Sequence, residues 1–260
     1  MTSTRMPALF LGHGSPMNAI TDNPYATRWA ELGASLPRPR AIVCVSAHWF
    51  TRGTGVTAME RPPTIHDFYG FPPELHAMEY ACPGSPELAA RVAELLAPLP
   101  VVQTEEWGLD HGAWSLLARM YPDADIPVIQ LSMDGTMSPQ FHYEAGKRLS
   151  ALRDEGVLVL GSGNVIHAGR GVDGEIGEDG LYTWATSFHT NLLDCIRSGE
   201  HEAIFDYESW VGGKQAAPTP EHFLPLFYIL GLVRDDDTVT FPVEGLERQG
   251  AFSMLAVQAG

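Results

Sequence analysis

The sequence has few cysteines, no long apolar run and half as many basic as acidic residues. Its three cysteines, Cys44, Cys82 and Cys195, are widely spaced and odd in number, which excludes a disulfide framework or a Cys-type zinc site and favours a reducing compartment. No apolar run reaches membrane-spanning length, and the N-terminal stretch MPALFLG is too short for a signal peptide. We therefore expect a soluble, cytoplasmic protein with no membrane partner.

The shortage of basic residues restricts the partners further. The formal net charge is −16, and a surface of this sign repels nucleic acid and anionic lipid, so neither is an expected partner. Hydrophobic residues make up 45% of the 260 residues, which is enough for a large core. Because we find no internal repeat, low-complexity tract or long linker, residues 1–260 are expected to form a single domain.

Short apolar runs predict the strands of a buried sheet. These runs do not alternate with polar residues, so both faces of the sheet should be covered by helices. The clearest are residues 8–11, 41–46, 128–132 and 157–160. Weaker strand signals cover residues 55–59, 101–104, 238–242 and 252–257.

Helices are predicted between these strands. Ser-Pro pairs at 85–86 and 138–139 and a Thr-Pro pair at 219–220 are typical of helix starts, and the second helix should run to about Gly156. Alternating strands and helices indicate an α/β domain with a mostly parallel or mixed central sheet. The Gly-rich, acidic stretch 169–181 is either an active-site flap or, slightly favoured, a tolerated insertion.

Four of the ten histidines stand at comparable places in this pattern. His13, His48 and His167 each follow a predicted strand, and ligands of open α/β sheets bind beyond the carboxyl ends of the strands. His222 falls in the first turn of the helix predicted to start at Thr219, where the helix dipole favours the neutral imidazole that a metal requires. Metal ligands and hydrogen-bonded turn residues are about equally compatible with this placement.

A fifth histidine, His111, directly follows Asp110, which can cap a helix over residues 111–120. The histidine spacing does not match HExxH, and no GxSxG motif surrounds the GSG at 161–163, so a serine hydrolase is unsupported. The other five histidines lie in polar or surface-like settings and are read as ordinary residues: His66, His76, His142, His189 and His201.

A set of motifs resembles a known family. They are LFLGHGSPMNAI, PRAIVCVSAHWFTRG, TIHDFYGFP, PGSPELAARV, WGLDHGAWSLLARMYPDADIPVIQLS, LRDEGVLVLGSGNVIH and PTPEHFLPL. Together, from about residue 6 to residue 258, they are similar to the 4,5-DOPA extradiol dioxygenases, which belong to the class III, LigB-like extradiol ring-cleavage dioxygenases. The resemblance implies a single-domain α/β enzyme with a non-haem metal.

When the motifs of the family are matched to those of this chain, the resemblance implies metal ligands at His13, His48 and His222. His167 corresponds to a histidine beside the metal that is either a fourth ligand or an acid/base group, and His111 corresponds to a catalytic histidine. After His167 this chain reads AGRG, where plant members read HPSN. Nearby aromatic residues that could pack on a substrate ring are Trp49, Phe68, Phe71 and Trp114.

The expected reaction is therefore the opening of a catechol ring, such as that of DOPA, by O₂ at one divalent metal ion per chain. Fe(II) is expected for activity because the metal has to relay electrons, and Zn(II) is a possible occupant of the same nitrogen ligands. Two alternatives remain at this stage: a zinc-dependent hydrolase, and a non-catalytic metal-binding or interaction module. Retention of His111 argues against the module, since mere binding needs no proton carrier.

Overall fold

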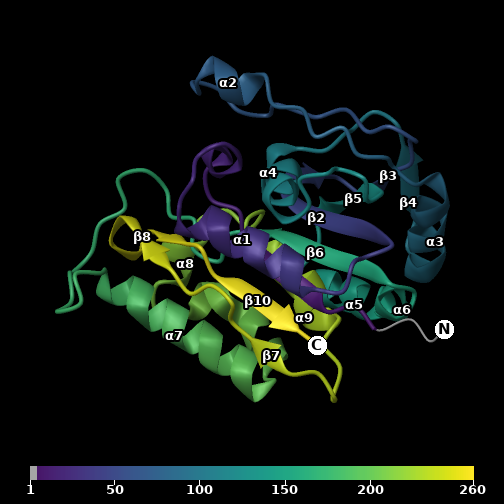
Figure 1. The fold of residues 1–260 in the computed structure, drawn as a ribbon. Helices are drawn as coiled ribbons and strands as arrows, with labels where there is room; N and C mark the ends of the chain where they lie inside the picture. The colour runs from purple at the N-terminus through teal and green to yellow at the C-terminus, as the bar shows by residue number, and fades with distance from the viewer. Residues whose placement is uncertain (1–4) are drawn as a thin grey trace.

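The computed structural model describes residues 5–260, which form an α/β domain around an eight-stranded sheet (Figure 1). The strand order is β4-β3-β5-β2-β6-β1-β10-β7. The strands of this sheet are β1 (Ala8–Gly12), β2 (Ala41–Thr51), β3 (Thr54–Thr57), β4 (Val101–Thr104), β5 (Val128–Asp134), β6 (Val157–Gly163), β7 (Val239–Thr240) and β10 (Ala256–Ala259). A separate hairpin pairs β8 (Leu246–Glu247) with β9 (Phe252–Ser253).

The centre of the sheet is parallel and its margins are mixed. Strands β5, β2, β6 and β1 run in one direction, whereas β10 is antiparallel to β1 and β3 is antiparallel to β5. Because β1, β2 and β6 are parallel neighbours, their carboxyl ends meet at one edge of the sheet. This confirms the mixed sheet that the sequence predicts, and it is the edge where ligands bind in such folds.

Helices cover both faces of the sheet (Figure 1). Apolar residues of α1 and α4 form the core on one face, and those of α3, α5, α7 and α9 form the core on the other. Strands β1, β5 and β6 are buried along their whole length, as the non-alternating runs predict. The helices are α1 (Pro24–Ser35), α2 (Pro73–His76), α3 (Pro86–Leu96), α4 (His111–Met120), α5 (Pro139–Arg148), α6 (Ala151–Asp154), α7 (Thr183–Ser198), α8 (Gly213–Ala216) and α9 (Leu224–Gly231), with 3₁₀ turns η1 (Pro16–Ala19), η2 (His201–Ser209) and η3 (Arg248–Gly250).

Several predicted boundaries are wrong in informative ways. The run 252–257 is two strands, β9 and β10, which belong to different sheets. The helix expected from 139 to about 156 is split into α5 and α6, and the carbonyl of Ser150 at the break accepts from the Arg153 N–H (3.3 Å) and from the Arg234 side chain (2.7 Å). His142 and His201, read as surface-like, are buried.

The prediction of a helix start at Thr219 is also wrong. Helix α9 begins at Leu224, and residues 220–223 form a preceding turn in which the Pro220 carbonyl accepts from the backbone N–H groups of Phe223 and Leu224. The Thr219 hydroxyl donates to Glu221 (2.7 Å) and caps no backbone group. His222 therefore lies in a turn ahead of the helix, and the helix-dipole argument for its neutral form does not apply.

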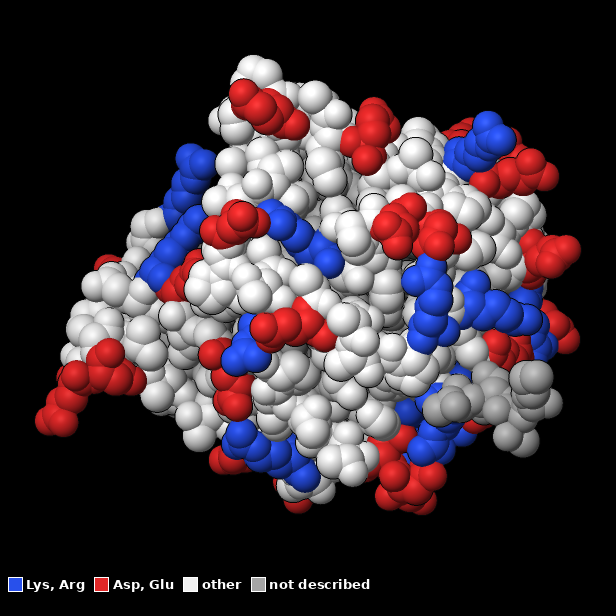
Figure 2. Space-filling model, viewed as in Figure 1, with Lys and Arg blue, Asp and Glu red and all other residues white. Residues whose placement is uncertain are grey.

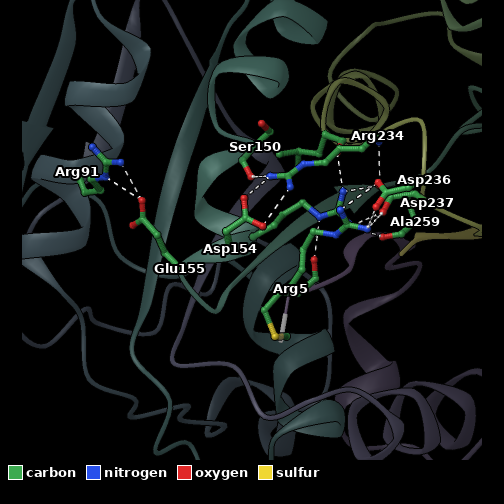
Figure 3. A network of polar contacts seen from close by, with 12 residues as sticks. Arg5, Arg91, Ser150, Asp154, Glu155, Arg234, Asp236, Asp237 and Ala259 are labelled. Carbon is green, nitrogen blue, oxygen red and sulfur yellow. Dashed lines mark hydrogen bonds and ion pairs between the residues drawn. The ribbon is translucent and has the colours of Figure 1, made fainter. Parts of the chain in front are cut away.

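The amino-end edge of the sheet is closed by a buried arginine. The five N–H donors of Arg153 are all bonded, to the carbonyls of Met6, Leu232 and Ala259 and to both carboxylate oxygens of Asp237. The cluster ties the start of β1 and the end of β10 to the turn after α9, and Figure 3 shows its members Asp237 and Ala259 within a network of polar contacts. We refer to Arg153, Asp237 and these three carbonyls as the arginine knot.

The surface is mixed in charge. In the view of Figure 2 acidic and basic side chains are interspersed over the face, without an extended basic patch. The three cysteines are free and buried, as expected from their spacing. Among residues 5–260, none of the helices is both long and apolar enough to cross a membrane.

Candidate metal centre

Three histidines converge at the carboxyl-end edge of the sheet. His13 directly follows β1, His48 lies in β2, and His222 comes from the turn before α9. One ring nitrogen of each lies within 4.8 Å of the corresponding nitrogen of the other two. The sequence places His48 just after its strand, but β2 continues to Thr51, with a shift in its register to β5 between Val45 and Phe50.

Close backbone approach allows this convergence. At Gly163 a Cβ atom would stand 2.2 Å from the carbonyl oxygen of His222, and at Gly112 it would stand 2.5 Å from the hydroxyl of Ser46 and 3.0 Å from the His48 ring. Only glycine fits at both positions. The backbone N–H of Asn164 also donates to the His222 carbonyl (2.9 Å), which holds the turn against the end of β6.

Hydrogen bonds fix which nitrogen of His13 is free. The Ser162 hydroxyl donates its single proton to the Gly112 carbonyl (2.6 Å), so it has to accept from His13 Nδ1, which lies 3.0 Å away. His13 is therefore protonated on Nδ1 and carries its lone pair on Nε2. Burial, and then the neighbouring imidazoles, hold the pKa of His13 well below its ordinary value, which keeps the ring neutral.

The other two rings are oriented by carboxylates. His48 Nδ1 lies 3.3 Å from Asp67 Oδ2, and His222 Nδ1 lies 3.4 Å from Glu221 Oε1. Each contact places a proton on Nδ1 and leaves Nε2 available, the arrangement that metal-binding histidines show. Burial would raise the pKa of Glu221, but hydrogen bonds from His222 and Thr219 lower it to about 2, so its carboxylate stays charged.

The distance between two of the free nitrogens fits a shared metal ion. His13 Nε2 and His48 Nε2 are 3.1 Å apart, so the two nitrogens share the space between the rings. Two imidazole nitrogens bound to one ion at about 2.0–2.1 Å lie about 3.0–3.4 Å apart. The spacing of the nitrogens therefore suits a single divalent metal ion.

His111 lies beside this group as the first residue of α4. The Asp110 carboxylate caps the helix at the Ala113 N–H (3.2 Å), which confirms the predicted cap. Asp67 accepts from the His111 backbone N–H (2.9 Å) and from its Nδ1 (3.0 Å), and the His111 ring packs 3.9 Å from that of His48. His111 is thus oriented through Nδ1 like the three converging histidines, and its Nε2 has no hydrogen-bond partner among residues 5–260.

A cavity of about 370 Å³ opens above these rings. It is lined by all five histidines named by the sequence, together with Phe68 and Phe71 and with residues from both ends of the chain: His13, Gly14, Ser15, Pro16, Asn18, Tyr25, His48, Phe68, Phe71, His111, His167, His222, Glu247, Arg248, Phe252 and Met254. The imidazoles form its base, and the phenyl rings offer apolar walls for a flat ligand.

Comparison with known proteins identifies the family. Residues 7–257 match the family described as the catalytic LigB subunit of aromatic ring-opening dioxygenase. An Escherichia coli (strain K12) protein named 4,5-DOPA dioxygenase extradiol is 55% identical over 100% of this chain and 97% of its own length. A Beta vulgaris protein of the same name is 42% identical over 85% of each chain. The chain belongs to the LigB family.

A solved structure supports this assignment. The crystal structure of an uncharacterized protein from Escherichia coli K12 superposes with a TM-score of 0.82 at 48% identity, covering 98% of this chain and 100% of that one. Extradiol dioxygenases of the LigB family use a single metal ion, and the three converging histidines fit that requirement.

His167 does not belong to the group of three converging histidines. Its ring stacks face to face on His222, with centroids 3.9 Å apart and planes 7° apart, and it stands outside the three-nitrogen group. Its backbone is fixed by a hydrogen bond to the Ala216 carbonyl (2.8 Å). Burial, and then the neighbouring His222, lower the pKa of His167 to about 4, so the ring is neutral near pH 7.

Two of the aromatic residues that the sequence singles out do not reach the cavity. Trp49 stacks on Trp107 elsewhere on the sheet, with centroids 5.7 Å apart, and the Trp114 indole donates to the Ile65 carbonyl within the core. None of the residues 169–181 lines the cavity either, which agrees with the favoured interpretation of that stretch as a plain insertion.

Sequence reasoning gave no role to several residues that shape the site. Asp67 orients two histidines from a loop without a helix or strand signal, and Ser162 does so from inside a buried strand. Arg248 and Tyr25 reach the cavity from a short turn and from α1. Asp67 stands in the quoted motif TIHDFYGFP, which was the one available signal for it.

Proposed function

We propose that the protein opens the ring of a catechol next to its two hydroxyl groups with O₂, using one divalent metal ion held by His13, His48 and His222. The observation that carries the proposal is the convergence of three imidazole nitrogens, from rings that are each oriented through Nδ1, in a cavity that is also lined by phenyl rings. Membership of the LigB family supports extradiol chemistry over the hydrolase and over the binding module.

The expected ion for activity is Fe(II). When bound, it supplies positions for the two catechol oxygens and the electron transfer between an aromatic ring and O₂ that zinc does not support. Zn(II) remains a possible occupant, because affinity for nitrogen ligands rises from Fe²⁺ towards the end of the series.

His111 is proposed as a proton carrier. Its Nδ1 proton is held by Asp67, so Nε2 is the atom that accepts a proton from a catechol hydroxyl and returns it later. Asp67 acts as a positioning residue that keeps the His111 and His48 rings in their tautomers. Such an acid/base group typically contributes about 10²–10⁴-fold to the rate.

His167 is proposed as an acid/base group rather than a fourth ligand. Face-to-face stacking supports this role, since the ring lies against His222 instead of joining the group of converging nitrogens. In this arrangement His167 lines the cavity beside the expected metal position and can exchange a proton with a bound ligand. Metal loss in His167→Ala protein would assign it as a ligand instead.

The relatives named 4,5-DOPA dioxygenase extradiol make DOPA the first substrate to test, followed by small alkyl or carboxyl catechols. Residues 1–260 are proposed to work as a single domain. The free, buried cysteines fit a reducing compartment, so we propose the cytoplasm as the place of action.

The decisive experiment combines metal analysis with oxygen uptake. Protein loaded with Fe(II) under argon should bind one ion per chain, consume O₂ only when a catechol is added, and yield a coloured ring-opened product. Protein with verified iron that shows no catechol-dependent uptake across the panel would contradict the proposal. Hydrolytic activity with zinc would then favour the hydrolase, and binding without turnover would favour the module.

A further inference from the structure

Among residues 5–260, Arg248 is the one residue with a lysine or arginine side chain that lines the cavity. Arg248 belongs to the turn η3 that joins β8 to β9, and the other lining residues carry uncharged or histidine side chains, apart from the acidic Glu247 next to it. In a chain of net charge −16, an anionic ligand meets a repulsive overall field. A cation at this position therefore changes what the cavity can bind.

The fold holds Arg248 in place at a conformational cost. Arg248 and Gln249 have φ values of +52° and +59°, a region that residues with a Cβ rarely adopt. The β8–β9 pairing fixes the turn on both sides, and the Gln249 carbonyl accepts from the Tyr182 N–H (2.8 Å). Such a conformation persists only where the surroundings determine it, so the direction of the Arg248 side chain is set by the fold.

The guanidinium group has unused binding capacity. It lies over the Phe252 ring, 5.4 Å from its centroid, and the Phe252 ring lies 5.3 Å from that of His167. Within residues 5–260, no carboxylate lies within ion-pair distance of Arg248, whereas all five donors of Arg153 are bonded. The cation thus sits on the cavity wall with its N–H donors open to a ligand.

We propose that Arg248 selects catechols that carry a carboxylate on the side of the ring away from the two hydroxyls; this inference rests on the proposed function. Arg248 lies over Phe252, Phe252 contacts His167, and His167 stacks on His222, so the guanidinium lines the same cavity as the histidines but two rings away from His222. A catechol whose hydroxyls face the histidines would therefore turn the opposite end of its ring towards the η3 turn. A guanidinium binds a carboxylate through two parallel hydrogen bonds. Glu247, the last residue of β8, also lines the cavity and adds a negative charge beside the guanidinium.

The test compares two substrates that differ in the charged arm. For Fe(II)-loaded Arg248→Gln protein, kcat/KM with 3-(3,4-dihydroxyphenyl)propionate should fall about 10- to 100-fold, mainly through KM, because a charge-assisted contact is lost. With 4-methylcatechol it should change by less than about threefold. Arg248→Lys keeps the charge without the paired geometry and should give an intermediate loss.

Gln249→Ala is the matched control. Gln249 shares the same turn and the same left-handed backbone, but its side chain does not line the cavity, so both substrates should behave as with the parent protein. Equal losses of both substrates in Arg248→Gln protein, together with a lowered melting temperature, would reduce Arg248 to a structural turn residue. An unchanged kcat/KM for the propionate would also overturn the proposal.

A binding measurement separates this inference from the proposed function. 3-Phenylpropionate has the carboxylate arm but no hydroxyls, so calorimetry reports its binding without any ring opening. Its affinity should fall about tenfold or more in Arg248→Gln protein. Equal affinities overturn the role of Arg248, whereas wild-type protein that holds iron and cleaves none of the catechols overturns the proposed function alone.

Discussion

The two edges of the central sheet both bury polar side chains, but they use them differently. At the amino-end edge, every N–H donor of Arg153 has a protein acceptor, and Asp237 is fully buried against it. At the carboxyl-end edge, His13 and His48 each have one nitrogen satisfied and direct the other at a neighbouring lone pair.

This difference distinguishes structural from functional polar groups. A buried network that is complete within the protein has no capacity left for a ligand and serves the fold (Figure 3). A buried group of oriented but unpaired nitrogens is unfavourable until something binds, and it persists because the rest of the fold supports it. The arginine knot should therefore matter for stability, and the histidine group for binding and rate.

The largest expected effect is at the histidine edge. His222→Ala removes a proposed ligand, so metal affinity should drop by more than about 100-fold and catechol-dependent O₂ uptake should fall to the background of metal-free protein. The melting temperature of the metal-free protein should fall only slightly, because the side chain loses one hydrogen bond to Glu221 and its stacking on His167. Oxygen uptake and calorimetry on the same preparation measure both quantities.

His76→Ala provides the matched control for this variant. His76 is an exposed histidine of α2, and its removal should leave metal content and rate unchanged. Full activity of His222→Ala protein at stoichiometric iron would erase the distinction between the two edges.

Substitutions in the arginine knot should have the converse effect, a loss of stability without a loss of rate. Arg153→Met removes two hydrogen bonds from the buried carboxylate of Asp237, which keeps only Arg5 and the Arg234 N–H as partners, and it should lower the free energy of unfolding by about 1–3 kcal/mol. The rate per folded, metal-loaded molecule should remain near the parent value. Urea unfolding and initial rates test the two halves of this prediction, with the exposed Arg28→Met as control.

A double substitution sharpens the result. Replacing Asp237 by Leu in the Arg153→Met background removes a buried carboxylate that only Arg5 and the Arg234 N–H still contact, so part of the lost stability should return. If the double variant is as unstable as the sum of two independent losses, the knot acts through its carbonyl contacts rather than through the buried ion pair.

His111→Phe should separate proton transfer from metal binding within the histidine edge. The three proposed ligands stay in place, so metal content should remain near normal while kcat falls by about 10²-fold or more. Measuring metal content, melting temperature and rate on one preparation tests this. A rate within a few-fold of the parent would remove His111 from the mechanism, and a lowered melting temperature alone would make it a packing residue.

Acid should affect the two edges at different pH. Burial lowers the pKa of His142, near the end of β5, to about 4, so the unfolded chain takes up this proton first and stability is lost as the pH falls from about 6.5 to about 4. Burial would raise the pKa of Asp237, but Arg153 lowers it below its ordinary value, so its stabilisation is present above about pH 4 and is lost below it.

Two variants test which residue causes the loss of stability in each pH range. Between neutral pH and pH 4, the His142→Gln protein should lose roughly 2–3 kcal/mol less unfolding free energy than the parent protein. Asp237→Asn should reduce only the loss that occurs below about pH 4. Urea unfolding at a series of pH values measures both slopes. An unchanged upper slope in His142→Gln protein would show that His142 is not the group that titrates there, and the loss would then belong to the other buried histidines whose pKa is lowered, among them His167 and His201.

The parallel core and its ligand edge could be predicted because they depend on local signals. Buried apolar runs mark β1 and β6, and a histidine at or soon after such a run must emerge at the same edge as its neighbours. His48 was placed correctly in space although β2 runs past it, since the end of the apolar run and the register shift coincide. His222 was placed at this edge by the wrong argument, a cap that Thr219 does not provide.

The supporting residues could not be predicted because their roles depend on long-range contacts. Ser162 orients His13 across 149 residues of sequence, and Asp67 orients His111 across 44. No local pattern distinguishes these side chains from other serines and aspartates. Arg248 owes its position to a turn with positive φ that lacks the usual glycine, so turn chemistry gave no signal for it.

Equilibrium metal binding is the most direct test of the central claim that three histidines at one edge of the sheet hold the catalytic ion. Metal-free wild-type protein titrated anaerobically with Fe(II) should take up one ion per chain, and His13→Ala, His48→Ala and His222→Ala should each bind more than about 100-fold more weakly. Stoichiometric, tight iron binding in all three variants, or no binding in folded wild-type protein, would contradict the account.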